Sequence, residues 1–141
     1  MPISTIKITA TETIAIGSEE DVVYLIRYVR MQAQRVGMTV LNQTKLITAT
    51  SELACNILNY AGAGDVLIDM VKRGKQTGLR LTFKDNGPGI ADLTQAMQNG
   101  HSTGMGLGLG LPGAKRLSSE FFIKSTVGQG TTVVITKWTN G

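Results

Sequence analysis

Apolar and polar residues alternate in five parts of this chain, and that period of two predicts β-strands there. The last four regions fall into two pairs, each joined by a polar, glycine-containing link that is typical of a hairpin. The first link is residues 72–78, and the second is Gly128-Gln129-Gly130. The five regions are Ile3 to Gly17, which holds one or two strands, Asp65 to Val71, Leu79 to Lys84, Phe121 to Val127 and Thr131 to Trp138.

A different spacing, with apolar residues three and four positions apart, predicts two long helices. The first begins after Ser18, whose hydroxyl can accept a hydrogen bond from a first-turn N–H, and it ends at Gly37. The second runs from about Asn42 to Tyr60, and a shorter third helix spans Leu111 to Ser119. The apolar stripe of the second helix is Leu46, Ala49, Leu53, Ile57 and Tyr60.

The order of these elements predicts the fold class. Strands joined as hairpins favour a largely antiparallel sheet, and the amphipathic helices must cover one of its faces. We therefore expect an α+β fold, a two-layer sandwich of one sheet and one helical layer. With 141 residues, of which 42% are hydrophobic, residues 1–141 are expected to form a single domain.

Charge and composition argue against several classes of partner. The net charge of +4 is modest, and the densest basic group, Lys72, Arg73 and Lys75, is expected to be a solvated hairpin. With aromatic residues at only 5%, nucleic acid is not an expected partner. No signal peptide and no apolar run of about 20 residues is present, and Cys55 is the one cysteine. We expect a cytoplasmic protein that does not enter a membrane.

Two glycine-rich segments indicate a nucleotide. Residues 85–89 read Asp-Asn-Gly-Pro-Gly, and residues 104–110 carry glycine at every second position just before a predicted helix. Glycines let backbone N–H groups approach a polyanion closely, and a helix start adds further N–H groups and a positive dipole end. The P-loop pattern and the context of a dinucleotide fingerprint are both missing. The sequence therefore predicts phosphate binding by another type of site.

Glu52 and Asn56 lie four residues apart, so they share one face of the second helix. The apolar stripe passes through Leu53 and Ile57, so the two polar residues should flank the core at a rim where a ligand can lie. A carboxylate there can take a proton, and an amide oxygen suits Mg²⁺. The alternative is a solvated polar face.

Asp85 ends a predicted strand and precedes Gly87 and Gly89. A carboxylate in that place can accept a hydrogen bond from an exocyclic amine such as that of adenine. The two glycines let the backbone pass close to a flat ring, and Ile90 can supply an apolar contact. A plain turn is the alternative interpretation.

Taken in order, these motifs resemble the GHKL superfamily of ATPases and kinases. They are Glu52 to Asn56 on a helix, residues 85–89, residues 104–110, and Gly128-Gln129-Gly130-Thr131 in a hairpin. Residues 51–64, 100–103 and 110–117 further resemble the small RsbT-type serine/threonine kinases, which are related to the anti-sigma-factor kinases. The resemblance implies a Bergerat fold, with a mixed sheet under three helices and ATP held between a helix and a lid.

The resemblance also implies roles for matching residues. Glu52 would be the general base, Asn56 would hold Mg²⁺, and Asp85 would receive the adenine amine in a pocket shaped by Gly87 and Gly89. The lid and the phosphate-binding segment would include Ser102, Thr103, Gly104, Gly106, Leu107, Gly108 and Gly110, while Thr131 would lie on the adenine side.

The activity implied by the resemblance is that of an ATP- and Mg²⁺-dependent protein serine/threonine kinase in bacterial partner switching. Its substrate would be a STAS-domain antagonist, and its second partner a metal-dependent protein phosphatase that it activates by binding. Two alternatives stay open: an anti-sigma-factor kinase that sequesters a sigma factor, and a non-catalytic module that uses ATP to gate protein binding. A homodimer is compatible with the resemblance.

Overall fold

The computed structural model describes residues 5–98 and 110–140, and in that part of the chain the predicted strands and helices are present. The N-terminal region forms one strand, and the short α3 is an addition that the sequence pattern does not predict. In chain order the elements are β1 (Lys7–Ile16), α1 (Glu19–Arg35), α2 (Val40–Tyr60), β2 (Gly64–Arg73), β3 (Gln76–Asp85), α3 (Leu93–Ala96), α4 (Gly110–Leu117), β4 (Glu120–Thr126) and β5 (Gly130–Trp138).

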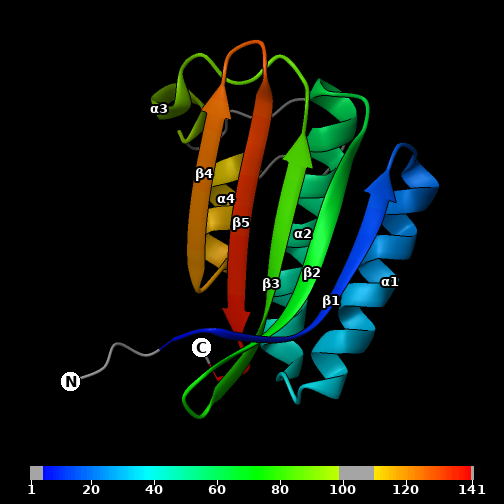
Figure 1. Ribbon diagram of the computed structural model, residues 1–141, viewed down its shortest axis with the longest axis vertical. Coiled ribbons are helices and arrows are strands. Elements are labelled where there is room, and N and C mark those ends of the chain that lie inside the picture. Colours follow the sequence, from blue (N-terminus) through cyan, green and yellow to red (C-terminus); the bar gives the residue numbers. More distant parts are fainter. Residues whose placement is uncertain (1–4, 99–109, 141) are drawn as a thin grey trace.

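The strands form one sheet in the order β1-β2-β3-β5-β4. Each neighbouring pair in this order is antiparallel, so the described strands form an antiparallel sheet where the resemblance implied a mixed one. Helices α1, α2 and α4 lie together on one face of this sheet (Figure 1). The predicted α+β sandwich with helices on one face is therefore confirmed.

The hairpin of β2 and β3 is longer than the alternation predicts. Its register runs from Gly64 paired with Asp85 to Arg73 paired with Gln76, so only Gly74 and Lys75 link the strands. The expected seven-residue link is wrong because backbone hydrogen bonds extend the ladder through residues whose side chains show no apolar alternation. Gly74 has a φ of +59°, a conformation that favours glycine at the turn.

Both long helices begin at side-chain caps. The hydroxyl of Ser18 accepts a hydrogen bond from the Asp21 N–H at 3.2 Å, as the sequence predicts. Helix α2 begins at Val40, two residues earlier than expected, because Thr39 caps it by accepting from the Asn42 N–H at 3.2 Å. These caps fix where each apolar stripe meets the sheet.

The core lies between the helical layer and the sheet. Side chains from both layers are almost fully removed from water, and their burial supplies most of the stabilisation of the fold. Leu25 and Val29 of α1, Leu53 of α2, Leu81 of β3 and Ile135 of β5 are each at most 2% exposed.

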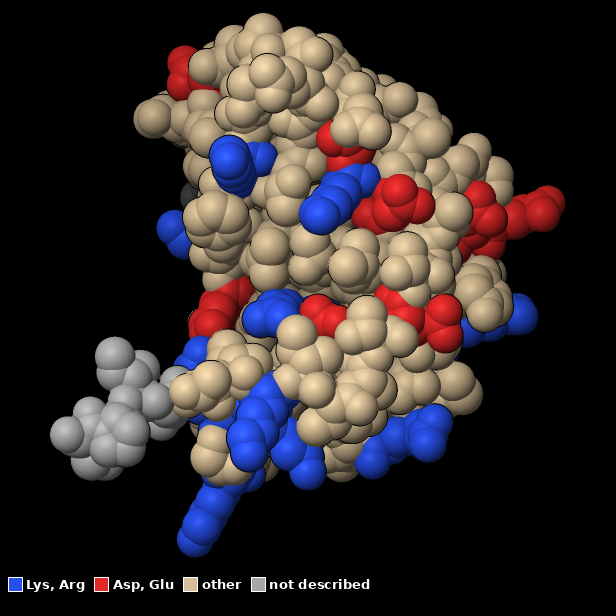
Figure 2. Space-filling view, in the orientation of Figure 1, with Lys and Arg blue, Asp and Glu red and all other residues tan. Residues whose placement is uncertain are grey.

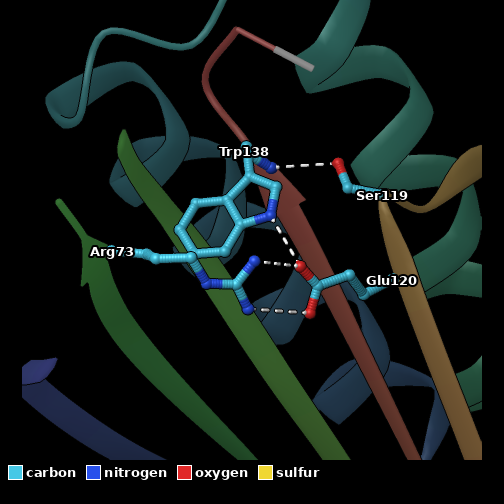
Figure 3. Close-up of polar contacts among 4 residues, drawn as sticks. All are labelled: Arg73, Ser119, Glu120 and Trp138. Carbon is cyan, nitrogen blue, oxygen red and sulfur yellow. Dashed lines mark hydrogen bonds and ion pairs between the residues drawn. The ribbon is translucent and has the colours of Figure 1, made fainter. Parts of the chain in front are cut away.

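A polar cluster fastens the end of the sheet where the β2–β3 hairpin and the C-terminus lie (Figures 1 and 3). Arg73 donates to Glu120 Oε2 at 2.9 Å, and its guanidinium lies 4.9 Å from the centroid of the Trp138 ring. The Trp138 indole N–H donates to the same carboxylate at 3.0 Å. The prediction of a solvated hairpin is therefore wrong for Arg73, whose side chain contacts Glu120 of β4 and Trp138 of β5.

The uncovered face of the sheet carries side chains of both charges (Figure 2). Asp69, only 6% exposed, accepts a hydrogen bond from the Thr11 hydroxyl at 2.7 Å and lies 3.5 Å from Arg80 Nε. These contacts join β1, β2 and β3 across that face. Among the helices that the structure describes, none has the length and apolar character needed to span a membrane.

Candidate active site

A pocket of about 250 Å³ lies between α2, the end of β3 and the hairpin of β4 and β5. Its walls are mostly apolar, with a few polar side chains among them, which is typical of sites for small molecules. The lining residues are Leu53, Asn56, Ile57, Tyr60, Phe83, Asp85, Pro88, Gly89, Ile90, Ala96, Leu111, Thr131 and Val133.

Asp85 is the last residue of β3, and its carboxylate is held by the loop that follows. Its Oδ1 accepts a hydrogen bond from the Gly87 N–H at 2.9 Å. A Cβ atom at Gly87 would lie 2.7 Å from Ala61 Cβ, so only glycine lets the loop pack against the end of α2. The carboxylate thus has a fixed orientation beside the pocket, with acceptor capacity left over.

The loop of residues 86–90 is also fastened to the β4–β5 hairpin. The N–H of Gly128 donates to the Pro88 carbonyl at 2.8 Å. Gly89 has a φ of +77°, and a Cβ atom there would clash with the Thr126 carbonyl. Two segments far apart in sequence therefore form one continuous rim of the pocket.

Ser125, on β4, contacts three groups at this rim. Its Oγ lies 2.7 Å from the Ile90 nitrogen, 3.2 Å from the Gly130 carbonyl oxygen and 2.8 Å from Thr131 Oγ1. Thr131 is in turn the cross-strand partner of Asp85. The sequence gives no signal for Ser125, because a serine in an edge strand has no distinguishing pattern.

Glu52 is 1% exposed, and its Oε2 accepts a hydrogen bond from the N–H of Gly110 at 3.1 Å. Gly110 is the first residue of α4, which packs against α2 and covers this carboxylate. The predicted position at a rim, and the alternative of a solvated face, are therefore both wrong for Glu52. A helix N-terminus offers N–H groups and a positive dipole end, which offset the cost of burying the charge.

Asn56 follows Glu52 by one helical turn and lines the pocket, so its amide can reach a ligand there. This residue fits the way that nucleotide sites commonly bind Mg²⁺. The protein supplies one oxygen ligand, here from Asn56, and the phosphates and water supply the remaining ligands. Within residues 5–98 and 110–140, no group of three or more histidine, cysteine, aspartate or glutamate side chains forms a metal cage.

Cys55 lies between these two residues in sequence but does not line the pocket. It is 8% exposed, and burial raises the pKa of its thiol. A buried, protonated thiol is a small apolar group rather than a nucleophile.

The structure gathers five of the predicted binding residues at one pocket: Asn56, Asp85, Gly89, Ile90 and Thr131. Three others lie next to it without lining it: Glu52 and Gly110 are hydrogen-bonded to each other, and Gly87 holds Asp85. The remaining predicted residues, Ser102, Thr103, Gly104, Gly106, Leu107 and Gly108, lie outside the described residues.

Tyr60 shows what sequence reasoning misplaced. The helical period assigns it to the core stripe, yet it is 53% exposed and lines the pocket at the last turn of α2. Leu53 and Ile57, from the same stripe, serve both the core and the pocket wall. Periodicity finds the apolar face of a helix, but it does not tell which part of that face a ligand covers.

Comparison with known proteins identifies the family of this chain. The family model described as histidine kinase-, DNA gyrase B- and HSP90-like ATPase matches residues 41–140. The serine/threonine-protein kinase RsbT of Bacillus subtilis (strain 168) is 42% identical over 125 residues, which cover 89% of this chain and 94% of that protein.

A solved structure has the same fold. The crystal structure of the RsbU and RsbW domains of Rv1364c from Mycobacterium tuberculosis matches with a TM-score of 0.64 and 18% identity, over 92% of this chain. This chain spans 32% of that longer one, and at this identity the match shows the fold alone. From the family match and the RsbT relative, the chain belongs to the histidine kinase-, DNA gyrase B- and HSP90-like ATPases, and within them to the RsbT-type serine/threonine kinases.

Proposed function

We propose that this chain is an ATP- and Mg²⁺-dependent protein serine/threonine kinase of a bacterial partner-switching pathway. Its substrate is a STAS-domain antagonist, and its second partner is a metal-dependent protein phosphatase that it activates by binding. The observation that carries the proposal is the buried Glu52 carboxylate, which an amide of α4 orients beside a pocket lined by Asn56 and Asp85. A site used only to bind nucleotide has no need of such a base.

The base of the nucleotide occupies the apolar pocket. Asp85 accepts a hydrogen bond from the exocyclic amine, because its orientation is already fixed by the Gly87 N–H. Ile57, Ile90 and Val133 provide apolar surface for the flat ring. This orientation directs the phosphates towards Asn56 and the start of α4.

Glu52 acts as the general base. It accepts the proton of the serine or threonine hydroxyl as that oxygen attacks the terminal phosphorus of ATP, and the bond to ADP breaks. The hydrogen bond to Gly110 fixes the orientation of the carboxylate before the substrate arrives. Such positioning is a large part of what phosphoryl transfer asks of a protein.

Asn56 supplies the protein oxygen for Mg²⁺. The ion, when bound, neutralises charge on the phosphates. Because Asn56 lies in α2 one turn from Glu52, the proposed metal ligand and the proposed base share one rigid element. Both therefore keep their relative position through the reaction.

Partner switching makes a prediction about binding. The unphosphorylated antagonist and the phosphatase should compete for this chain, and phosphorylation of the antagonist should release it. Size-exclusion chromatography of the chain with each partner, before and after addition of Mg·ATP, tests this. Transfer of the chain from the antagonist to the phosphatase is expected; co-elution with a sigma factor in place of the phosphatase would contradict the proposal.

A further inference from the structure

Ser125 has three partners for one hydroxyl group, and this number restricts where the protons lie. The Ile90 N–H can only donate to Ser125, and the Gly130 carbonyl can only accept from it. The third partner, the Thr131 hydroxyl, could in isolation do either.

A serine hydroxyl has one proton to donate and two lone pairs that accept. All three contacts are hydrogen bonds at once only if the Ser125 proton goes to the Gly130 carbonyl. Ser125 must then accept from Ile90 and from Thr131. The proton of Thr131 is thereby committed to Ser125, so Thr131 Oγ1 has only lone pairs left to offer a ligand in the pocket that this residue lines.

Asp85, the cross-strand partner of Thr131, is the second polar group at this end of the pocket. Its carboxylate is also an acceptor. Two adjacent acceptors suit a base edge that offers two N–H hydrogens, and they repel an edge that presents an oxygen.

We propose that Ser125 is a positioning residue that sets base specificity: by taking the Thr131 proton it makes the pocket select a 6-amino purine over a 6-oxo purine. The inference rests on the proposed ATP-binding function. The 6-amino group of adenine carries two hydrogens and can satisfy both acceptors. Hypoxanthine has an oxygen at that position and only one hydrogen on the neighbouring ring nitrogen, so one acceptor faces a lone pair.

The experiment measures the dissociation constants of ATP and of inosine triphosphate and compares their ratio among variants. In Ser125→Ala, the Thr131 hydroxyl is free to rotate and donate to the 6-oxo oxygen. The preference for ATP should then fall by about three- to tenfold, the effect of one neutral hydrogen bond. Loss of the Ile90 contact changes both affinities together and leaves their ratio unchanged.

Two variants serve as controls. Ser125→Thr keeps the hydroxyl and should keep the wild-type ratio. Ser118→Ala deletes the same atom from a serine that donates to the Ala114 carbonyl in α4, and it should also leave the ratio unchanged. Thr131→Val should lower the ratio, and adding Ser125→Ala to Thr131→Val should lower it no further, because Ser125 acts through Thr131.

The outcomes separate the inference from the function on which it rests. If wild type binds neither nucleotide, the proposed function fails. If wild type prefers ATP and Ser125→Ala keeps that preference, the specificity role of Ser125 is refuted while the kinase assignment stands. The same holds if Ser125→Ala lowers the preference equally in wild type and in Thr131→Val. Should Ser125→Ala not fold, an unchanged ratio in Thr131→Val would refute it as well.

Discussion

Gly130→Ala tests the junction between the β4–β5 hairpin and the nucleotide pocket. Gly130 has a φ of +132°, and a Cβ atom there would clash with the Asp85 carbonyl oxygen and lie 2.9 Å from Asn86 Cα. Both contacts are with backbone, so no side-chain rotation relieves them. Because Asp85 lines the pocket, the strand end that must move is the one that holds the base.

The same turn contains a matched control. Gly128 also has a positive φ, +79°, but a Cβ atom there has no neighbour within 4 Å. An alanine at Gly128 therefore costs only the left-handed backbone conformation, about 1 kcal/mol. At Gly130 the backbone region costs up to about 3 kcal/mol, and the clash adds to it.

Thermal unfolding gives the comparison. For a chain of this size 1 kcal/mol corresponds to about 3 °C in Tm, so we expect a loss of about 3 °C for Gly128→Ala and of about 10 °C for Gly130→Ala. ATP affinity should fall by about tenfold or more in Gly130→Ala alone, because Asp85 is displaced. Equal Tm losses in the two variants, or an unchanged affinity in Gly130→Ala, would refute the close contact between hairpin and pocket.

Two further predictions concern Lys137 and Glu120, two charged residues whose pKa values the fold lowers. Lys137 is 4% exposed, and burial lowers the pKa of its amine from 10.5. The charged amine therefore destabilises the fold at neutral pH. This loss of stability is recovered as the pH rises from the lowered folded pKa to the unfolded value. Lys137→Met should therefore raise Tm at pH 7 by about 3 °C, and the variant should lack the rise in stability that wild type shows at alkaline pH. An unchanged Tm of the variant at pH 7 would contradict this. Burial alone would raise the pKa of Glu120, but hydrogen bonds from Trp138 and Arg73 outweigh it and hold the pKa below 4.5. This carboxylate thus stabilises the fold above its unfolded pKa, and the stability is lost as the pH falls through the lowered folded value. Urea midpoints of wild type and Glu120→Gln should differ at pH 7 and converge in acid, and a constant difference would contradict the assignment.

The sequence determines much of the fold because its signals are local. Ser18, Gly37 and the hairpin glycines act on neighbouring residues, so they predict the two long helices and the strand pairs that the structure contains. The tip of the β2–β3 hairpin was missed, since its strands extend through polar residues that carry no alternation. The contacts of Arg73 with Glu120 and Trp138 depend on the order of the strands in the sheet, which no local sequence pattern indicates.

The candidate site divides in the same way. Asp85, Gly89 and Asn56 stand in recognisable motifs, and the fold brings them to one pocket. The burial of Glu52 could not be read from the helix alone, because α4 covers it from 58 residues further along the chain. The role of Ser125 cannot be predicted from the sequence for the same reason. Its three hydrogen-bond partners come together only when the rim of the pocket is folded.

The central claim is that this chain transfers phosphate to a protein hydroxyl with Glu52 as the base. It is tested most directly by the intact mass of a STAS-domain protein encoded beside this gene, after incubation with Mg·ATP and the chain. We predict a gain of one phosphoryl group with wild type and none with Glu52→Gln, although that variant still binds ATP. No gain with ATP-bound wild type, or the same gain with Glu52→Gln, would contradict the account.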